Sequence, residues 1–346
     1  MGFPNNNKCF IIAELSANHN GDKELALKTI REAAESGADA IKLQTYTPDS
    51  MTLDSEKDDF VIKQGTIWDG RRLHDLYQEA YTPWEWHKEL FDEAKRLGLF
   101  CFSSPFDLKA VDLLEELSCP AYKIASFEIT DIPLIRYVAS KGKPMIISTG
   151  IAELEDIKLA IATCIEEKNT DITILKCTSS YPAPLELANL KTILDIPERF
   201  GVEVGLSDHT MGSTAALVAV SLGAKVIEKH FILDKNLGGP DASFSMEPYD
   251  FKQMVKQVRE AEIALGEVSY ELSEKTKKSR GFSRSLYIAE DIKKGEVLNE
   301  QNLRSVRPGF GLHPKYLPSL LGKTVNRDLE KGDPFQLDYV NESLSI

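Results

Sequence analysis

Two histidines each end a short apolar run, Gly205-Leu-Ser-Asp-His209 and Val226-Ile-Glu-Lys-His230. The stretch between them, residues 213–222, has the composition of a helix and is closed by Gly223. A strand–helix–strand unit places both imidazoles at the same end of neighbouring parallel strands, which lie about 5 Å apart. The pattern therefore favours a metal site formed by His209 and His230. The alternative is that both are buried core or helix-capping histidines.

Six further apolar runs precede these two, and helical stretches separate them. The eight expected strands are residues 9–15, 40–45, 99–104, 121–126, 144–149, 172–178, 202–207 and 226–231. The clearest expected helices are 23–36, 84–97, 108–117, 132–141, 154–167, 213–222 and 249–265. Eight βα units of this buried type predict an α/β fold, the TIM (β/α)8 barrel. No Gly-x-Gly-x-x-Gly follows the first strand, which argues against a dinucleotide-binding fold.

The chain of 346 residues is longer than the barrel requires. We expect the barrel at residues 1–266, a charged linker at 267–280 and a small separate domain at 281–346 with short strands and Lys-Gly turns. An insertion at 48–83 follows the second strand. A loop of that length at the active face of a barrel is typical of a lid or a substrate wall.

The composition restricts the partners and the location. A formal net charge of −13 argues against nucleic acid as a partner. No run of 18 apolar residues exists, so no membrane span is predicted. The five cysteines are scattered, which indicates reduced thiols, and residues 1–8 lack an apolar signal core. These features predict a cytoplasmic protein.

The expected carboxyl ends of the strands form the active face of a TIM barrel, and here they are polar. They carry Glu14, Asn18, Lys42, Gln44, Ser103, Ser104, Lys123, Ser126, Glu128, Ser148, Thr149, Thr178, Ser179, Tyr181, Ser207, His209, Glu228 and His230. A lysine inside an apolar strand is costly unless it is paired. Lys42 and Lys123 therefore form either a cationic pocket for a phosphate or carboxylate, or structural bridges to Glu14 or Glu128.

This residue set suits one type of chemistry. A metal with two protein ligands keeps open positions for water and a substrate carbonyl. Together with the anion-binding lysines, it predicts carbon–carbon bond formation between a phosphorylated enol and an aldehyde. A class I aldolase with Lys123 or Lys42 as a Schiff base is the alternative, but it leaves the two histidines unexplained.

Several motifs together resemble the sialic acid synthase family, over essentially the whole chain. They are Ala17-Asn-His-Asn-Gly21, Lys42-x-Gln44, Ser103-Ser-Pro-Phe106, Ala121-Tyr-Lys-Ile124, Ser148-Thr-Gly150, Cys177-Thr-Ser-Ser-Tyr-Pro182, Gly205-Leu-Ser-Asp-His-Thr210 and Glu228-Lys-His-Phe231. The C-terminal module, which carries Arg307-Pro-Gly309, resembles the antifreeze-like (SAF, β-clip) domain of that family.

Further stretches, such as Gln44-Thr-Tyr-Thr-Pro-Asp-Ser50, Trp68-Asp-Gly-Arg71 and Gly311-Leu-His-Pro-Lys315, indicate one branch of the family. The resemblance implies condensation of phosphoenolpyruvate with 2,4-diacetamido-2,4,6-trideoxy-L-altrose, with release of phosphate. It also implies a divalent metal, Mn²⁺, Mg²⁺ or Co²⁺. Synthesis of N-acetylneuraminate or legionaminate by the same chemistry is the nearest alternative, and a non-catalytic carbohydrate-binding barrel is an alternative of another class.

The resemblance assigns roles residue by residue. It gives the metal to His209 and His230, and phosphoenolpyruvate to Lys42, Ser104, Lys123, Ser126, Ser148, Ser179 and Ser207. It gives the acceptor sugar to Gln44, Tyr181 and Asp241, with Arg307 supplied by the partner subunit of a domain-swapped homodimer.

Two residues depart from the family pattern, because Asn20 replaces a glutamate and Ser179 replaces an asparagine. Glu128 then becomes the candidate acid/base, unless it forms a salt bridge to one of the lysines. His19 is expected to orient the first turn of the site rather than to bind the metal.

Overall fold

A computed structural model of the chain describes residues 8–341 and divides into two compact units, one ending at Gly266 and one beginning at Glu267. The prediction for residues 1–8 lies outside the described residues except for Lys8. Within residues 8–341 no helix combines the length and the apolar character needed to cross a membrane.

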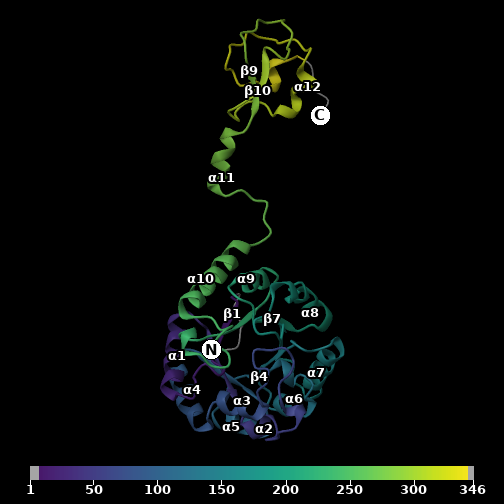
Figure 1. Cartoon of the computed structure of the whole chain (residues 1–346). Coiled ribbons are helices and arrows are strands. Elements are labelled where there is room, and N and C mark those ends of the chain that lie inside the picture. The colour runs from purple at the N-terminus through teal and green to yellow at the C-terminus, as the bar shows by residue number, and fades with distance from the viewer. Residues whose placement is uncertain (1–7, 342–346) are drawn as a thin grey trace. The chain divides into compact units, whose positions relative to one another are not determined.

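The first unit is a closed parallel barrel, as predicted, in which each strand pairs with the next and β8 pairs with β1 (Figure 1). Its strands are β1 (Phe10–Glu14), β2 (Ala40–Thr45), β3 (Phe100–Pro105), β4 (Tyr122–Ile124), β5 (Met145–Ser148), β6 (Ile172–Cys177), β7 (Glu203–Asp208) and β8 (Val226–His230). Nearly every strand residue is buried, since helices cover the outside of the barrel and side chains fill its inside.

The helices of the first unit follow the strands in the expected alternation. They are α1 (Lys23–Glu35), α2 (Pro48–Met51), α3 (Leu73–Ala80), α4 (His87–Arg96), α5 (Leu108–Glu116), α6 (Ile132–Ala139), α7 (Leu154–Glu166), α8 (Thr192–Phe200), α9 (Thr214–Ser221) and α10 (Pro248–Leu265). Asp22, Asp107 and Asp131 cap α1, α5 and α6 by accepting backbone N–H groups. Helix α8 was not among the clearest expected helices, and Pro197 stands inside it, where proline is disfavoured.

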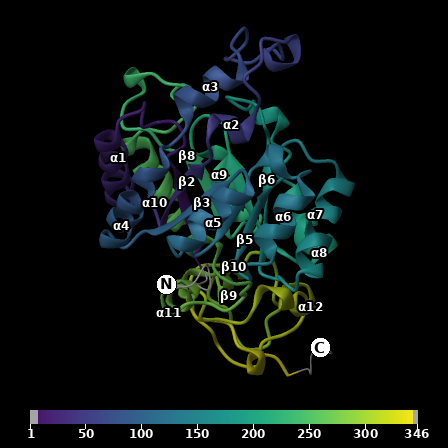
Figure 2. The same cartoon turned by 90° about the horizontal axis from the view of Figure 1, so that it is seen from below.

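The insertion at 48–83 contains the short helices α2 and α3, which contact each other on one side of the barrel (Figure 2). Short 3-10 turns mark the insertion and the loops after the strands. They are η1 (Asp58–Phe60), η2 (Trp84–Trp86), η3 (Ser126–Glu128), η4 (Leu185–Leu187) and η5 (Lys235–Leu237).

The second unit has its own small core, which includes Leu286, Leu303 and Phe335. Strand β9 (Ser285–Ile288) pairs antiparallel with β10 (Leu303–Val306), and its helical segments are α11 (Glu274–Ser279), η6 (Arg280–Phe282), η7 (Pro314–Tyr316), α12 (Leu317–Leu320) and η8 (Leu337–Tyr339). Part of the expected linker is thus helical. The two Lys-Gly turns need glycine, since Gly295 and Gly332 have φ values of 89° and 98°.

Candidate active site

The two histidines lie side by side at one rim of the barrel. His209 follows β7 and His230 ends β8, where Asp208 is paired with Lys229. Their ring centroids are 5.3 Å apart. Gly205 permits this close approach of the strands, because a Cβ there would lie 2.5 Å from the backbone oxygen of Val226. The expected convergence of the imidazoles is therefore present.

The two rings differ in their surroundings. His209 donates from Nδ1 to the carbonyl of Thr178 at 3.0 Å, which leaves Nε2 as a lone-pair donor. The Nδ1 of His230 is buried without a hydrogen-bond partner in the described residues and lies 3.6 Å from Asp241 Oδ2. Burial, with His209 nearby, lowers the pKa of His230 well below its usual range, so this ring is neutral.

A cysteine lies next to this pair. The Cys177 sulfur is 3.8 Å from His209 Nδ1. Burial acts to raise the pKa of Cys177, but the adjacent His209 outweighs burial and lowers it to about 7. In the same way Cys177 opposes the effect of burial on His209 and raises the pKa of that ring. No group of three or more His, Cys, Asp or Glu side chains within residues 8–341 is arranged to hold a metal ion.

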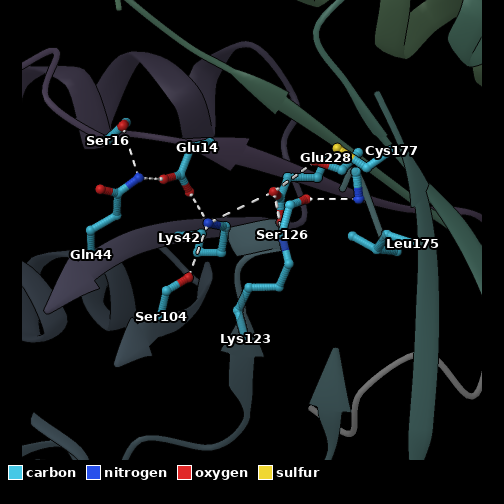
Figure 3. A network of polar contacts seen from close by, with 12 residues as sticks. Glu14, Ser16, Lys42, Gln44, Ser104, Lys123, Ser126, Leu175, Cys177 and Glu228 are labelled. Atoms are coloured by element: carbon cyan, nitrogen blue, oxygen red, sulfur yellow. Dashed lines mark hydrogen bonds and ion pairs between the residues drawn. The ribbon is translucent and has the colours of Figure 1, made fainter. Parts of the chain in front are cut away.

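Both lysines are buried and paired across the barrel interior (Figure 3). Lys42 Nζ lies 2.7 Å from Glu14 Oε2 and 3.7 Å from Glu228 Oε1, and it donates to Ser104 Oγ at 3.3 Å. Lys123 donates to both oxygens of Glu228 at 2.7 and 2.8 Å. The partner of Lys123 is thus Glu228 rather than Glu128.

Two lysines and two glutamates of this network neutralise one another, and each changes the pKa values of the others. Burial raises the pKa of Glu14 to about 7 despite Lys42. Burial acts to raise the pKa of Glu228 as well, but the two lysines lower it to about 2. Burial lowers the pKa of Lys123, whereas the two carboxylates outweigh burial and raise the pKa of Lys42. Glu14 is therefore the carboxyl of this network that most readily takes up a proton.

Several serine hydroxyls surround the lysines, and two of them are unused. Ser148 Oγ and Ser179 Oγ are buried without a hydrogen-bond partner among the described residues. Ser126 Oγ accepts the backbone N–H of Gly150 at 3.1 Å, and Ser207 donates to Glu228 Oε1. A Cβ at Gly150 would lie 2.0 Å from Ser179 Oγ and 2.8 Å from Ser126 Oγ. Glycine is thus required where these hydroxyls gather, and unsatisfied buried donors suit a bound anion.

Glu128 ends the 3-10 turn after β4 and forms no ion pair with a lysine in residues 8–341. Its Oε2 atom is buried and has no hydrogen-bond partner there. Burial raises the pKa of Glu128 to about 7. A carboxyl that titrates near neutrality suits general acid/base chemistry.

Two of the residues expected to contact an acceptor sugar, Gln44 and Asp241, join the network that contains Glu14. Gln44 donates from Nε2 to Glu14 Oε1 and to Ser16 Oγ, both at 2.9 Å, and Ser16 donates to Asp241. The ring of Tyr181 lies 4.5 Å from the ring of His209.

Arg307 belongs to the second unit, where it is exposed. The loop after Arg307 is held by Ser285 Oγ, which donates to the Pro308 carbonyl and accepts from the Gly311 N–H.

The first turn of the barrel is fixed by its own side chains. His19 is fully buried, accepts the Gly21 N–H at Nδ1 and donates from Nε2 to Thr82 Oγ1 at 3.1 Å. Burial lowers its pKa to about 4, so it is a neutral ring with both nitrogens in use. Asn20, where the family pattern has glutamate, donates to the carbonyls of Leu237 and Gly238. Both contacts support an orienting role for this turn.

Sequence reasoning gave no role to Glu228, although it links both lysines. Its position could have indicated this, because Glu228 stands two residues before His230 on β8, so that both side chains point to the same face of the strand. A second buried pair, Lys229 Nζ to Asp208 Oδ2 at 2.7 Å, was also missed. These two residues precede His230 and His209 directly and join the ends of β7 and β8.

A closed (β/α)8 barrel with paired lysines, unused hydroxyls and two imidazoles at one rim defines an enzyme that handles a small anionic substrate. The sequence model of the NeuB family matches residues 29–270, and that of the SAF domain matches residues 283–340. The chain belongs to the NeuB family, which confirms the resemblance carried by the motifs.

Two relatives are similar to the chain over nearly its full length. "Pseudaminic acid synthase" of Campylobacter jejuni subsp. jejuni is 53% identical over 96% of both chains. The protein of the same name from Helicobacter pylori is 50% identical over 96% of this chain and 98% of its own. Among solved structures, the N-acetylneuraminic acid (sialic acid) synthetase of Leptospira borgpetersenii in complex with citrate has a TM-score of 0.71 at 30% identity. This match covers 81% of this chain and 94% of the Leptospira chain.

Proposed function

We propose that the protein is a pseudaminic acid synthase, which condenses phosphoenolpyruvate with 2,4-diacetamido-2,4,6-trideoxy-L-altrose. The observation that carries this proposal is the 53% identity over 96% of the chain to a relative of that name. In the reaction, C3 of the enol attacks the aldehyde carbon of the open-chain sugar and a C–C bond forms. Water adds to C2, and the C2–O bond to phosphate then breaks, so that pseudaminic acid and inorganic phosphate leave.

Phosphoenolpyruvate would bind between Lys42 and Lys123, with Ser104, Ser126, Ser148, Ser179 and Ser207 as hydroxyl partners. The unused hydroxyls of Ser148 and Ser179 support this assignment, since each can donate to a phosphate or carboxylate oxygen. Glu14 and Glu228 balance the lysines when the anion is absent. When the anion binds, the raised pKa of Glu14 allows that carboxyl to take a proton, which relieves the repulsion between two negative groups.

Glu128 would move the protons of the reaction. Its pKa of about 7 keeps both protonation states populated near neutral pH, so the same carboxyl can accept a proton from the attacking water and return it. The unpartnered Oε2 supports this role, because among the described residues nothing occupies that oxygen, which can therefore exchange a proton with substrate or water.

The residues present fit a divalent cation, for which Mn²⁺, Mg²⁺ or Co²⁺ is expected. His209 and His230 would hold it, since one ring is oriented by the Thr178 carbonyl and the other has a buried Nδ1 without a partner. When bound, such a cation supplies Lewis-acid polarisation of the aldehyde oxygen. His209→Ala with full, chelator-resistant activity would contradict this part of the proposal.

Gln44, Tyr181 and Asp241 would hold the acceptor sugar, with Arg307 supplied by the partner subunit of a domain-swapped homodimer. The fixed loop after Arg307 and the exposure of its side chain support a role in binding a group outside its own unit. Mixing His230→Ala with Arg307→Ala chains should restore some activity in heterodimers. If confirmed subunit exchange gave no recovery, Arg307 would act within its own chain. A cytoplasmic location stays a prediction.

Phosphate release with a panel of acceptor sugars tests the proposed reaction. We expect turnover with 2,4-diacetamido-2,4,6-trideoxy-L-altrose and little with N-acetylmannosamine or the legionaminate precursor. Turnover with N-acetylmannosamine alone would refute the assignment while leaving the family chemistry intact.

A further inference from the structure

Ser16 links two parts of the site that the proposed reaction uses separately. It is buried in the turn after β1, two residues beyond Glu14. Its Oγ accepts a hydrogen bond from Gln44 Nε2 at 2.9 Å, and Gln44 Nε2 also donates to Glu14 (Figure 3). The same Oγ donates to Asp241 Oδ2, which lies 3.6 Å from His230 Nδ1. Ser16 therefore connects the carboxylate of the anion pocket with the carboxylate beside the imidazole pair.

The carboxylates at the two ends determine the directions of these hydrogen bonds. An ionised carboxylate oxygen only accepts, so the Gln44 amide nitrogen faces Glu14 and the single proton of the Ser16 hydroxyl goes to Asp241. Both amide protons of Gln44 are then used, one by Glu14 and one by Ser16. The Oε1 atom of Gln44 points away from both partners (Figure 3). A ligand beside Gln44 therefore meets a hydrogen-bond acceptor.

The backbone at Ser16 is unusual for a residue with a side chain. Its φ is 47°, in the left-handed region that glycine adopts most readily. Such a conformation carries strain for other residues, and it persists where surrounding contacts fix it, often at functional sites. Glycine would form this turn more easily, so what the serine adds is its hydroxyl and the two hydrogen bonds of that hydroxyl.

The backbone of Asp241 is held by other residues. Ser245 Oγ donates to the Asp241 carbonyl at 2.7 Å, and Asn18 Nδ2 donates to Ser245 Oγ at 2.8 Å. The carboxylate itself is bound by Ser16 and by the backbone N–H of Ala17. Loss of the Ser16 hydroxyl would therefore loosen the carboxylate while the loop around it stays in place.

We propose that Ser16 is a positioning residue, which holds Gln44 and Asp241 in the arrangement that receives the acceptor sugar. This inference rests on the proposed function, because it takes Gln44 and Asp241 as residues that contact the sugar. Both present acceptor oxygens, so the sugar group that they bind is a hydrogen-bond donor, a hydroxyl or an acetamido N–H. Ser16 has no proton left for the sugar. It acts by ordering its two neighbours before the sugar binds, which reduces the ordering that binding requires.

The test measures phosphate release by Ser16→Gly and Ser16→Ala. Both variants lose the hydroxyl, but glycine also removes the backbone strain, so Ser16→Gly should melt at a higher temperature than Ser16→Ala. Because a misplacement of about 1 Å can cost about 100-fold, kcat/KM for the acceptor sugar should fall about 10- to 100-fold in both. The KM for phosphoenolpyruvate should stay at the wild-type value, because neither Lys42 nor Lys123 is bonded to Ser16 within residues 8–341.

Ser118→Gly is the matched control. Ser118 is exposed, follows α5 and has a φ of 56°, so the same replacement removes similar strain away from the site. This control should keep the wild-type kcat/KM for both substrates. A double-mutant cycle with Gln44→Ala then shows whether Ser16 acts through its neighbour. If it does, adding Ser16→Gly to Gln44→Ala should lower kcat/KM for the sugar by less than Ser16→Gly does alone.

Three results would overturn the proposal. They are a wild-type kcat/KM for the sugar in both folded Ser16 variants, losses that multiply fully in the double variant, and an equal rise in the KM for phosphoenolpyruvate. A failure of the proposed function differs from these, because wild-type protein would then release no phosphate with the diacetamido sugar. In that case the same comparison is made with the acceptor that wild-type protein uses.

Discussion

Replacement of Glu128 by glutamine tests whether this carboxyl is the buried acid/base. Its pKa is raised from 4.5 to about 7 by burial. The folded state therefore binds this proton more tightly than the unfolded chain, and stability decreases as pH rises from about 4.5 to about 7. At about 1.4 kcal/mol per pKa unit, the ionised form costs about 3 kcal/mol at pH 8 and less than about 1 kcal/mol at pH 5. Glutamine mimics the neutral acid and avoids that cost.

Denaturant unfolding of wild-type protein and Glu128→Gln at pH 5 and pH 8 measures the effect. We expect the variant to be more stable by up to about 3 kcal/mol at pH 8 and nearly equal at pH 5. Glu116→Gln, at an exposed position of α5, is the control and should show no such pH dependence. A difference between wild type and Glu128→Gln that stayed constant from pH 5 to pH 8 would refute the raised pKa.

The same variant should lose activity although it gains stability. Loss of a general acid/base lowers kcat by about 100- to 10,000-fold. Phosphate release should fall by that amount, and the pH dependence near 7 should disappear from the residual rate. A stable variant with wild-type kcat would show that another group moves the protons.

Three further predictions address the anion pocket and the metal. Ser148→Ala should raise the KM for phosphoenolpyruvate about 10- to 100-fold. It should not lower the melting temperature, because Ser148 Oγ has no protein partner within residues 8–341. An unchanged KM would show that Ser148 does not bind phosphoenolpyruvate. Lys123→Met should destabilise the protein by about 3–5 kcal/mol, because Glu228 keeps only its weaker partner. Adding Glu228→Gln should recover the stability, measured by unfolding, but not the activity, measured by phosphate release. Recovered activity in that double variant would make the pair purely structural. A chelator should abolish phosphate release and Mn²⁺ should restore it, whereas chelator resistance would contradict the metal assignment.

The sequence determined the barrel and the identity of its polar rim. Apolar runs of strand length alternate with helical stretches, and this alternation alone requires a parallel sheet with its strand ends on one face. For the same reason His209, His230, Lys42 and Lys123 could be placed on one rim before any coordinates were considered, since each stands in or just after an apolar run. Local patterns of this kind are visible in sequence because they depend on neighbours a few residues away.

Only the tertiary structure decided which of these residues pair with one another. Lys123 and Glu228 are 105 residues apart, and closure of the barrel brings β4 and β8 to opposite sides of one interior. The ring contacts of Trp68 with Tyr181 and Phe244 likewise bring an insertion after β2 against loops after β6 and β8. The raised pKa of Glu128 is also a property of the folded chain, because it results from burial. Pairing and burial depend on distances across the fold, which no local pattern of residue types contains.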